Sequence, residues 1–248
     1  MKHLKLFEQF ISEGFYDPGI LKAFFMAGGL GSGKSYVANE IFGFPKHGVA
    51  STSYATGLKI VNSDNAFEKM ASEAGFELDK IGEIDNPEEW AKLMSIRDKA
   101  KLLTRKLQHN YMIGRLGLVI DGTGKDANKI EKQRNLIHDA LGYDTFMVFV
   151  NTSLEVALER NRKRDRQLPD QMVEKMWLEV QNNIGKFQKI FGHDKVFIVD
   201  NSSYDDNETL LQIEKLIRRE MSKPVQNNGG KTWLRMNDPK LASKNRPM

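Results

Sequence analysis

A glycine-rich loop near the start of the chain has the residue types and the spacing that bind phosphate. Residues 28–35 read Gly-Gly-Leu-Gly-Ser-Gly-Lys-Ser and match the pattern G-x-x-x-x-G-K-[ST]. Glycines in such a loop let backbone N–H groups turn toward an anion, the lysine reaches the terminal phosphates, and the serine hydroxyl binds Mg²⁺. We expect these residues to contact a nucleotide: Gly28, Gly29, Gly31, Ser32, Gly33, Lys34, Ser35 and Tyr36.

The segments on either side of this loop favour a phosphate site over a glycine-rich turn that matches the pattern by chance. Residues 23–27 form an apolar run, as a buried parallel strand requires. Residues 36–42 can form a helix whose positive N-terminus faces the phosphates. The sequence therefore predicts a site for ATP, or for GTP, with Lys34 as a catalytic residue and Ser35 as a ligand of Mg²⁺.

Two aspartates follow apolar runs farther along the chain. Residues 58–61 and 118–121 read as strands, and Asp64 and Asp121 lie at their carboxyl ends, where ligands gather in open parallel sheets. We expect Asp64 to orient an acceptor hydroxyl or take its proton, as phosphoryl transfer to an alcohol requires. A helix cap is the alternative role for Asp64. Asp121 is expected to hold Mg²⁺ through its water shell.

Residues 160–169 contain the densest basic cluster in the part of the chain that we expect to fold. Because the cluster follows an expected strand and helix, it fits a lid that closes over triphosphate, with arginines neutralising charge on the moving phosphoryl group. A solvated run of charges is the alternative.

A polar, mostly helical stretch over residues 68–114 separates the second expected strand from the third, with a long helix over residues 88–113. Arg97, Lys101 and Arg105 recur at every fourth position of that helix, so one face of it can meet an anionic acceptor. A solvated helix face is the simpler interpretation of the same spacing.

The order of these elements predicts a three-layer α/β fold with a five-stranded parallel sheet. The remaining strands are expected at residues 145–150 and 195–199, and residues 200–202 lie where an adenine ring is expected. Further helices are expected at residues 127–141, 154–159, 170–191 and 206–221.

Composition and charge limit the class of protein. The 248 residues include no cysteine, which excludes disulfides and thiolate metal sites and is compatible with a reducing cytoplasm. No apolar run approaches the ~20 residues of a membrane span, so we expect no membrane partner. The sequence does not indicate an oligomeric state.

The net charge of +4 comes from the C-terminal segment, because residues 222–248 hold six basic residues and one acidic residue. This segment also holds three of the seven prolines and an Asn-Asn-Gly-Gly cluster, so we expect it to be mostly irregular and solvated. The alternative is a weak nucleic-acid arm in which Trp233 stacks on bases.

Taken in order, the phosphate loop, the Val-Asn-Ser-Asp strand end at residues 61–64, the Ile-Asp-Gly-Thr-Gly turn at residues 120–124 and the arginine-rich cluster resemble the zeta-toxin-like P-loop kinases. The resemblance covers residues 22–220 and extends to the phosphorylating domain of polynucleotide kinases. The chain is also similar to proteins of T4-like bacteriophages in the zeta-toxin or ATPase class.

This resemblance implies an ATP-dependent phosphotransferase that moves the γ-phosphate to a hydroxyl of a nucleotide-like acceptor, with Asp64 as the base and Arg160 and Arg164 as lid arginines. Zeta toxins phosphorylate a UDP-amino sugar, and that acceptor remains an implication of the resemblance. Polynucleotide kinases place an arginine three residues after the base, where this chain has Phe67, which weakens a nucleic-acid acceptor. An ATPase or switch without an acceptor, and a DNA or RNA hydroxyl kinase, are the alternatives.

The N-terminal residues resemble a capsid-targeting leader of T4-like bacteriophages. Residues 1–13 have apolar positions at helical spacing and end in Ile-Ser-Glu, where a prohead protease would cut after Glu13. A short amphipathic helix that packs on the domain is the alternative. We therefore expect an N-terminal segment at residues 1–21, a P-loop kinase domain at 22–221 and a basic segment at 222–248, located in the cytoplasm of an infected bacterium or packaged in the virion.

Overall fold

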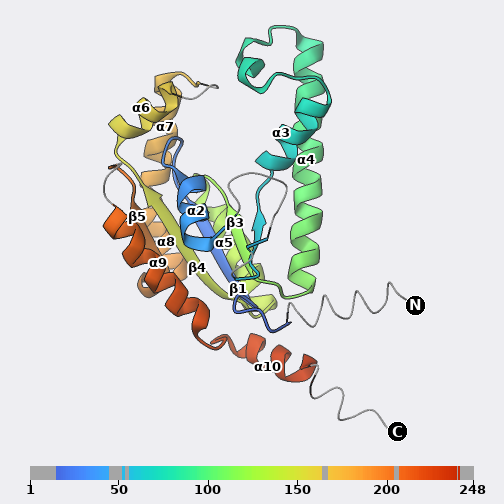
Figure 1. Ribbon diagram of the computed structural model, residues 1–248, viewed down its shortest axis with the longest axis vertical. Coiled ribbons are helices and arrows are strands. Elements are labelled where there is room, and N and C mark those ends of the chain that lie inside the picture. Colours follow the sequence, from blue (N-terminus) through green and yellow to red (C-terminus); the bar gives the residue numbers. More distant parts are fainter. Residues whose placement is uncertain are drawn as a thin grey trace, which may run out of the picture.

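The computed structural model describes residues 15–44, 52–53, 56–163, 167–203, 207–238 and 240. Its five strands form one parallel sheet in the order β2-β3-β1-β4-β5, which confirms the predicted α/β fold (Figure 1). The expected leader at residues 1–13 lies outside the described residues. The strands are β1 (Lys22–Ala27), β2 (Lys59–Val61), β3 (Leu118–Asp121), β4 (Asp144–Asn151) and β5 (Val196–Asp200).

Helices cover both faces of the sheet, which gives the fold its three layers. On one face, Ile41 of α2 and Ile217 of α9 pack in one apolar cluster. On the other face, Ile137 and Phe187 pack in a second cluster with the helices that follow β3 and β4. These elements are α2 (Lys34–Phe42), α5 (Ala127–Asn135), η2 (Leu136–Ala140), α6 (Leu154–Arg162), α7 (Asp170–Gln181), α8 (Ile184–Phe191), η3 (His193–Lys195) and α9 (Asn207–Ser222).

The helical stretch between β2 and β3 forms an arm that projects from the sheet, with a core of its own (Figure 1). Phe67, Leu93 and Ile96 are buried in that core. The long helix begins after Asn86, whose side-chain oxygen accepts a hydrogen bond from the Glu88 N–H at 2.9 Å, as an N-cap does. The arm consists of α3 (Asp64–Glu73), η1 (Leu78–Glu83) and α4 (Pro87–Ile113).

The single helix that we predicted over residues 170–191 is wrong, because the structure has two helices, α7 and α8, separated at residues 182–183. Asn183 is buried at the break, and its side-chain amide donates to the main-chain oxygens of Gly124 and Lys125, at 2.9 Å each. The break therefore allows the start of α8 to hold the loop that follows β3. The apolar residues keep their helical spacing across residues 182–183, so this spacing did not reveal that the helix ends there.

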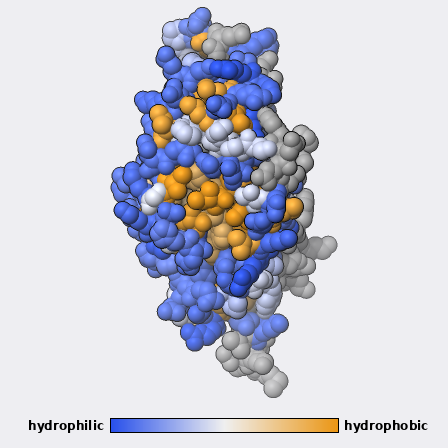
Figure 2. Space-filling model, turned by 90° about the vertical axis from the view of Figure 1, so that its left-hand side faces the viewer, coloured by the Kyte–Doolittle hydropathy of each residue, from blue (hydrophilic) through white to orange (hydrophobic). Residues whose placement is uncertain are grey.

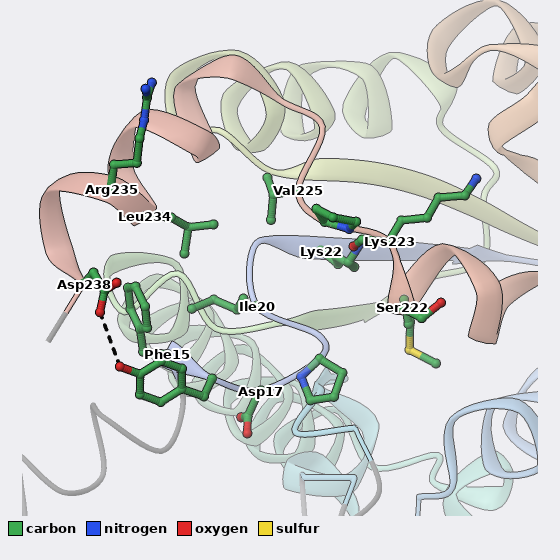
Figure 3. Close-up of a pocket in the computed structure, with 14 residues that line it drawn as sticks. Phe15, Asp17, Ile20, Lys22, Ser222, Lys223, Val225, Leu234, Arg235 and Asp238 are labelled. Carbon is green, nitrogen blue, oxygen red and sulfur yellow. Dashed lines mark hydrogen bonds between the residues drawn. The ribbon is translucent and has the colours of Figure 1, made fainter. Parts of the chain in front are cut away.

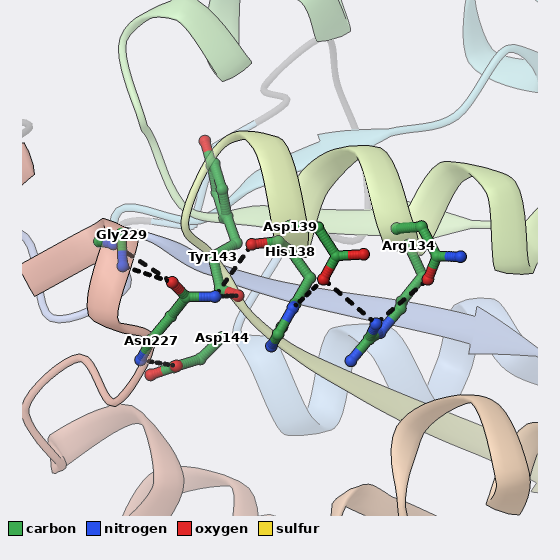
Figure 4. A network of polar contacts seen from close by, with 9 residues as sticks. Arg134, His138, Asp139, Tyr143, Asp144, Asn227 and Gly229 are labelled. Atoms are coloured by element: carbon green, nitrogen blue, oxygen red, sulfur yellow. Dashed lines mark hydrogen bonds and ion pairs between the residues drawn. The ribbon is translucent and has the colours of Figure 1, made fainter.

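The segment after residue 222, which we predicted to be mostly irregular, contains a helix that the sequence analysis did not predict, α10 (Asn228–Asn237). Asn227 caps this helix by accepting from the N–H groups of Gly229 and Gly230, and its own amide donates to the main-chain oxygen of His138 at 2.9 Å (Figure 4). A β-carbon on Gly230 would lie 2.3 Å from the Gly142 oxygen, so glycine is required for this close packing. Asparagine and glycine here begin a helix rather than a free tail.

The C-terminal segment also borders an open hollow of about 710 Å³, which the chain that enters β1 lines on the other side (Figure 3). Lys22 in its wall is buried, and its ammonium donates to the main-chain oxygens of Glu220 and Lys223 at 2.7 and 2.8 Å. Burial lowers the pKa of Lys22 from its ordinary value. These contacts join the end of α9 to the centre of the sheet.

At the opposite side of the sheet from the arm, β5 is an edge strand and Ile198 within it is 38% exposed. Figure 2 turns this side of the molecule toward the viewer and shows apolar residues gathered near the middle of a largely hydrophilic face. Among the described residues, no helix has both the length and the apolar character needed to cross a membrane.

Candidate active site

The phosphate loop begins where β1 ends, and neighbouring segments enclose it. Gly31 and Gly33 have φ values of +74° and +81°, which other residues rarely adopt. A β-carbon on Gly31 would lie 2.5 Å from the main-chain oxygen of Ala157, and one on Gly33 would lie 2.3 Å from Asn201 Nδ2. Glycine is thus required both by the backbone conformation and by the close approach of α6 and the segment after β5.

The polar groups of the loop are arranged around its interior. Lys34 Nζ donates to the Gly28 main-chain oxygen at 2.9 Å, and α2 starts at Lys34 itself. Ser32 Oγ is buried and has no hydrogen-bond partner among the described residues. Ser35 and Tyr36 are exposed in the first turn of α2. A loop with a lysine, a helix N-terminus and an unpaired hydroxyl fits the phosphate groups of a nucleotide.

Two side chains from distant segments support the outer face of the loop. Asn201 Nδ2 donates to the Ser32 main-chain oxygen at 2.7 Å, and Arg160 Nη1 donates to the Gly31 oxygen at 3.3 Å. The sequence indicated Asn201 only as a neighbour of the adenine ring, and its position at the carboxyl end of β5 was the available signal. Arg160, expected in the lid, lies against the loop here. Arg164 lies outside the described residues.

The second and third strands bring the acidic residues together. Val61 pairs with Ile120 across the sheet, so Asn62 follows β2 beside Asp121. Asn62 Nδ2 donates to Asp121 Oδ2 at 2.8 Å, and Asn62 Oδ1 accepts from the Asp64 N–H at 2.7 Å. The side chain of Asn62 therefore connects the carboxylate of Asp121 to the main chain of Asp64.

Asp64 is the first residue of α3, and the N-cap position is occupied by Ser63, whose side chain makes no capping hydrogen bond. The Asp64 side chain is exposed. A carboxylate in the first turn interacts favourably with the helix dipole, which is a structural reason for an acidic residue at this position.

Electrostatics at Asp121 depend on burial and on both neighbouring charges. Burial raises the pKa of Asp121, the positive charge of Lys34 lowers it, the carboxylate of Asp64 raises it, and the hydrogen bond from Asn62 lowers it. The net shift is upward. Lys34, Asp64 and Asp121 are thus close enough to interact electrostatically, at the end of the sheet where the loop lies.

The residues around Asp121 fit a hard cation bound together with phosphate. Asp121 Oδ1 is buried and has no hydrogen-bond partner among the described residues, so it can accept from a metal-bound water. Within the described part of the chain, no group of three or more acidic or histidine side chains is placed to hold a metal. Mg²⁺ would therefore depend on Ser35, Asp121 and the oxygens of the nucleotide, as such ions do.

Comparisons with known proteins agree with this geometry. A family model described as an AAA domain, AAA_33, matches residues 24–184. No curated protein matches the sequence.

Three solved structures share the fold, at sequence identities that show the fold alone. The AvrRxo1-ORF1:ORF2 complex with ATP has a TM-score of 0.54 at 14% identity, covering 94% of this chain and 83% of that chain. The PezAT chromosomal toxin–antitoxin system of Streptococcus pneumoniae has a TM-score of 0.52 at 14% identity, covering 90% and 96%. A candidate kinase from Chloroflexus aurantiacus has a TM-score of 0.50 at 10% identity, covering 82% and 97%.

Proposed function

The chain belongs to the AAA_33 family of AAA domains and has a P-loop kinase-like fold, and from this premise we propose that it is a kinase. In this proposal it transfers the γ-phosphoryl group of ATP, in the presence of Mg²⁺, to a hydroxyl of a nucleotide-like acceptor. ATP is favoured over GTP because a relative of the same fold, AvrRxo1, has been determined with ATP.

The observation that carries the proposal is the exposed carboxylate of Asp64, which follows β2 and lies within electrostatic reach of Asp121. An acceptor hydroxyl must be oriented and must lose its proton as the phosphoryl group is transferred, and an exposed carboxylate can do both. The attacking water of an ATPase has the same requirement, so transfer of label to an acceptor is what separates the two reactions. Asp64 meets that requirement.

The proposed step moves one phosphoryl group. The acceptor oxygen forms a bond to the γ-phosphorus as the bond from that phosphorus to the bridging oxygen of ADP breaks, and the hydroxyl proton passes to the Asp64 carboxylate. Lys34 and the loop N–H groups stabilise the charge on the phosphate oxygens. Mg²⁺, when bound, neutralises part of that charge.

The lid arginines complete the proposed site. Arg160 reaches the loop from α6 and is placed to approach the phosphates once its hydrogen bond to the Gly31 oxygen is exchanged. Arg164 is proposed to act beside it from the basic cluster. Closure of such a segment would exclude water, which otherwise would accept the phosphoryl group in place of the acceptor.

The nucleic-acid alternative is weakened by the position of Trp233. Its ring packs 5.9 Å from the Phe15 ring, and the Arg115 guanidinium lies 5.7 Å from its centroid. A side chain held in this way is not available to stack on bases. We therefore do not assign the basic C-terminal segment a role in acceptor binding.

The proposal is tested with γ-labelled ATP, Mg²⁺ and a panel of UDP-amino sugars, nucleosides, nucleotides and 5′-hydroxyl DNA. We expect label on one acceptor class, and a reduction of roughly 10²- to 10⁴-fold in transfer for Asp64→Asn. Lys34→Ala should abolish transfer. Asp194→Asn is the matched control, since Asp194 lies before β5 at the other edge of the sheet.

ATP affinity should persist in Asp64→Asn, because that residue does not touch the phosphate loop. Release of free phosphate alone in every reaction would favour an ATPase or nucleotide switch and would contradict the proposed kinase.

A further inference from the structure

The helical arm contains one cation whose surroundings differ from those of its neighbours. Of the three basic residues spaced along α4, Lys101 lies 3.4 Å from the Asp98 carboxylate in an exposed ion pair, and Arg105 is exposed. Arg97 is partly buried, and its guanidinium carbon lies 5.4 Å from the centroid of the Phe67 ring. Arg97 makes no hydrogen bond or ion pair with any described residue.

Phe67 places this cation next to the proposed base. Phe67 follows Asp64 by three residues in α3, so the two side chains lie on the same face of that helix, one turn apart. Phe67 is itself buried against α4, which fixes its ring. The charge of Arg97 therefore lies beside the turn of α3 that carries Asp64.

The phase of α4 shows which way Arg97 points. At about 100° per residue, Arg97 is roughly 40° and 60° away from Tyr111 and Met112 around the helix axis. Those two side chains pack against the main core of the domain. Ile113 and Leu102, which are 62% and 51% exposed, lie on the outer side. Arg97 thus points toward the body of the domain rather than away from it.

The contact with Phe67 leaves the hydrogen-bonding capacity of Arg97 unused. A guanidinium over an aromatic ring is held without hydrogen bonds, so its N–H groups can still bind an oxyanion in a fork. An anionic acceptor must also approach the carboxylates of Asp64 and Asp121, which repel it. A cation held against Phe67, which lies one turn along α3 from Asp64, offsets part of that repulsion.

We propose that Arg97, held over Phe67, binds a phosphate group of the acceptor beside Asp64, so that the hydroxyl that receives the phosphoryl group belongs to a compound that is already phosphorylated. That the bound phosphate belongs to an acceptor rests on the proposed kinase function, whereas phosphate binding by Arg97 depends only on the residues of the arm. Arg97 is then a residue that determines specificity, while Asp64 acts on the hydroxyl.

The subsite is tested with inorganic phosphate as the probe, on the full chain with Mg²⁺ and a non-hydrolysable ATP analogue filling the phosphate loop. The Nε–H resonance of Arg97 in ¹⁵N-arginine-labelled protein is assigned by its loss in Arg97→Lys. We expect this resonance to shift in a saturable way with phosphate, but not with chloride at equal ionic strength. The resonance of Arg219, exposed on α9, should not saturate and is the control.

Transfer kinetics give a second readout with the acceptors that receive label. Arg97→Gln should lower kcat/KM by about ten- to a hundredfold, mainly through a higher KM, because it removes charged hydrogen bonds to the acceptor. Arg97→Lys should recover part of the loss, and Arg219→Gln should change nothing. A cooperative thermal unfolding transition of Arg97→Gln, near that of the unmodified protein, is the control that the variant is folded.

The outcomes separate this inference from the kinase proposal. If phosphate shifts Arg97 in a saturable way but no acceptor receives label, the subsite stands and the kinase function fails. If transfer occurs and Arg97→Gln has the kcat/KM of the unmodified protein, the kinase function stands and the role of Arg97 is refuted. A shift that chloride reproduces also refutes the subsite.

Discussion

The strands of the sheet begin along one edge and end along the opposite edge, and each of these two edges carries a lysine and an aspartate within electrostatic reach of each other. The two pairs have different partners. At the edge where the strands begin, Lys22 and Asp144 are neighbours in register. Lys22 donates to two main-chain oxygens, and Asp144 accepts from the main-chain N–H groups of Gln226 and Asn227 at 2.8 Å each. All of these partners lie in residues 220–227, so this pair fixes the C-terminal segment.

At the edge where the strands end, the corresponding pair is Lys34 and Asp121, which also interact electrostatically. Asp121 Oδ1 has no hydrogen bond among the described residues, and burial raises the pKa of this carboxyl. A buried polar atom without a partner costs free energy, so it persists where a ligand supplies the partner. The first pair contributes to stability, whereas the second retains capacity for binding.

The largest effect on stability should come from Asp144→Ala, at the edge where the strands begin. Asp144 is only 4% exposed. The change removes two charge-assisted hydrogen bonds and leaves the main-chain N–H groups of Gln226 and Asn227 without their acceptor. We expect the free energy of unfolding to fall by on the order of 3 kcal/mol, measured by urea denaturation. Nucleotide affinity of the folded protein should not change.

Asp98→Ala is the control for that change, since Asp98 takes part only in an exposed ion pair with Lys101. Such pairs contribute about 0–1 kcal/mol. If the two variants lost equal stability, the Lys22 and Asp144 pair would not be a structural anchor, and the contrast between the two edges would fail.

Asp121→Asn should have the opposite effect on stability. Because the pKa of Asp121 is raised in the folded protein, ionisation costs more there than in the unfolded chain. The unmodified protein therefore loses stability, relative to the variant, as pH rises from the ordinary aspartate pKa through the raised one. At neutral pH the variant should unfold at a higher temperature.

The same substitution should weaken Mg²⁺-dependent nucleotide binding, measured by calorimetry with and without the metal. The stability difference between the variant and the unmodified protein should disappear in acid, where Asp121 is protonated in both states. A variant that is less stable than the unmodified protein at neutral pH would show that Asp121 supports the fold in the way that Asp144 does.

The two edges also differ in how far the sequence predicts them. The phosphate loop is contiguous at residues 28–35, and Asp64 and Asp121 each follow an apolar run, so local patterns sufficed to predict the sheet and to propose these residues for the site. The partners of Lys22 lie about 200 residues away, at sequence separations of 198 and 201. No local pattern reports such contacts, and α10 was missed for the same reason.

Within the site, the sequence indicated residue types but not their contacts. Arg97, Lys101 and Arg105 look equivalent in the sequence, because their spacing shows only that they lie on one face of a helix. Arg97 differs from the other two through its tertiary contact with Phe67, and Lys101 differs through an ion pair with Asp98, three residues earlier in the same helix. The connecting role of Asn62 likewise depends on the pairing of β2 with β3.

Asn62→Ala should have a smaller effect, on the pH dependence of kcat/KM rather than on stability, and this effect distinguishes the two edges most directly. The hydrogen bond from Asn62 lowers the pKa of Asp121, so Asn62→Ala should raise that pKa further. The acid limb of the pH profile of kcat/KM should then move to higher pH, because a protonated Asp121 cannot hold the metal. Stability should change little, since Asn62 is only partly buried.

Asn227→Ala is the matched change at the other edge, because it removes an asparagine amide that donates to the main-chain oxygens of His138 and Tyr143. It should lower the free energy of unfolding by about 1–2 kcal/mol and leave the pH profile in place, since Asn227 lies at the opposite end of the strands from the phosphate loop. A pH profile that moved in Asn227→Ala and not in Asn62→Ala would reverse the assignment of the two edges. The two asparagines therefore test whether each edge acts through its own aspartate.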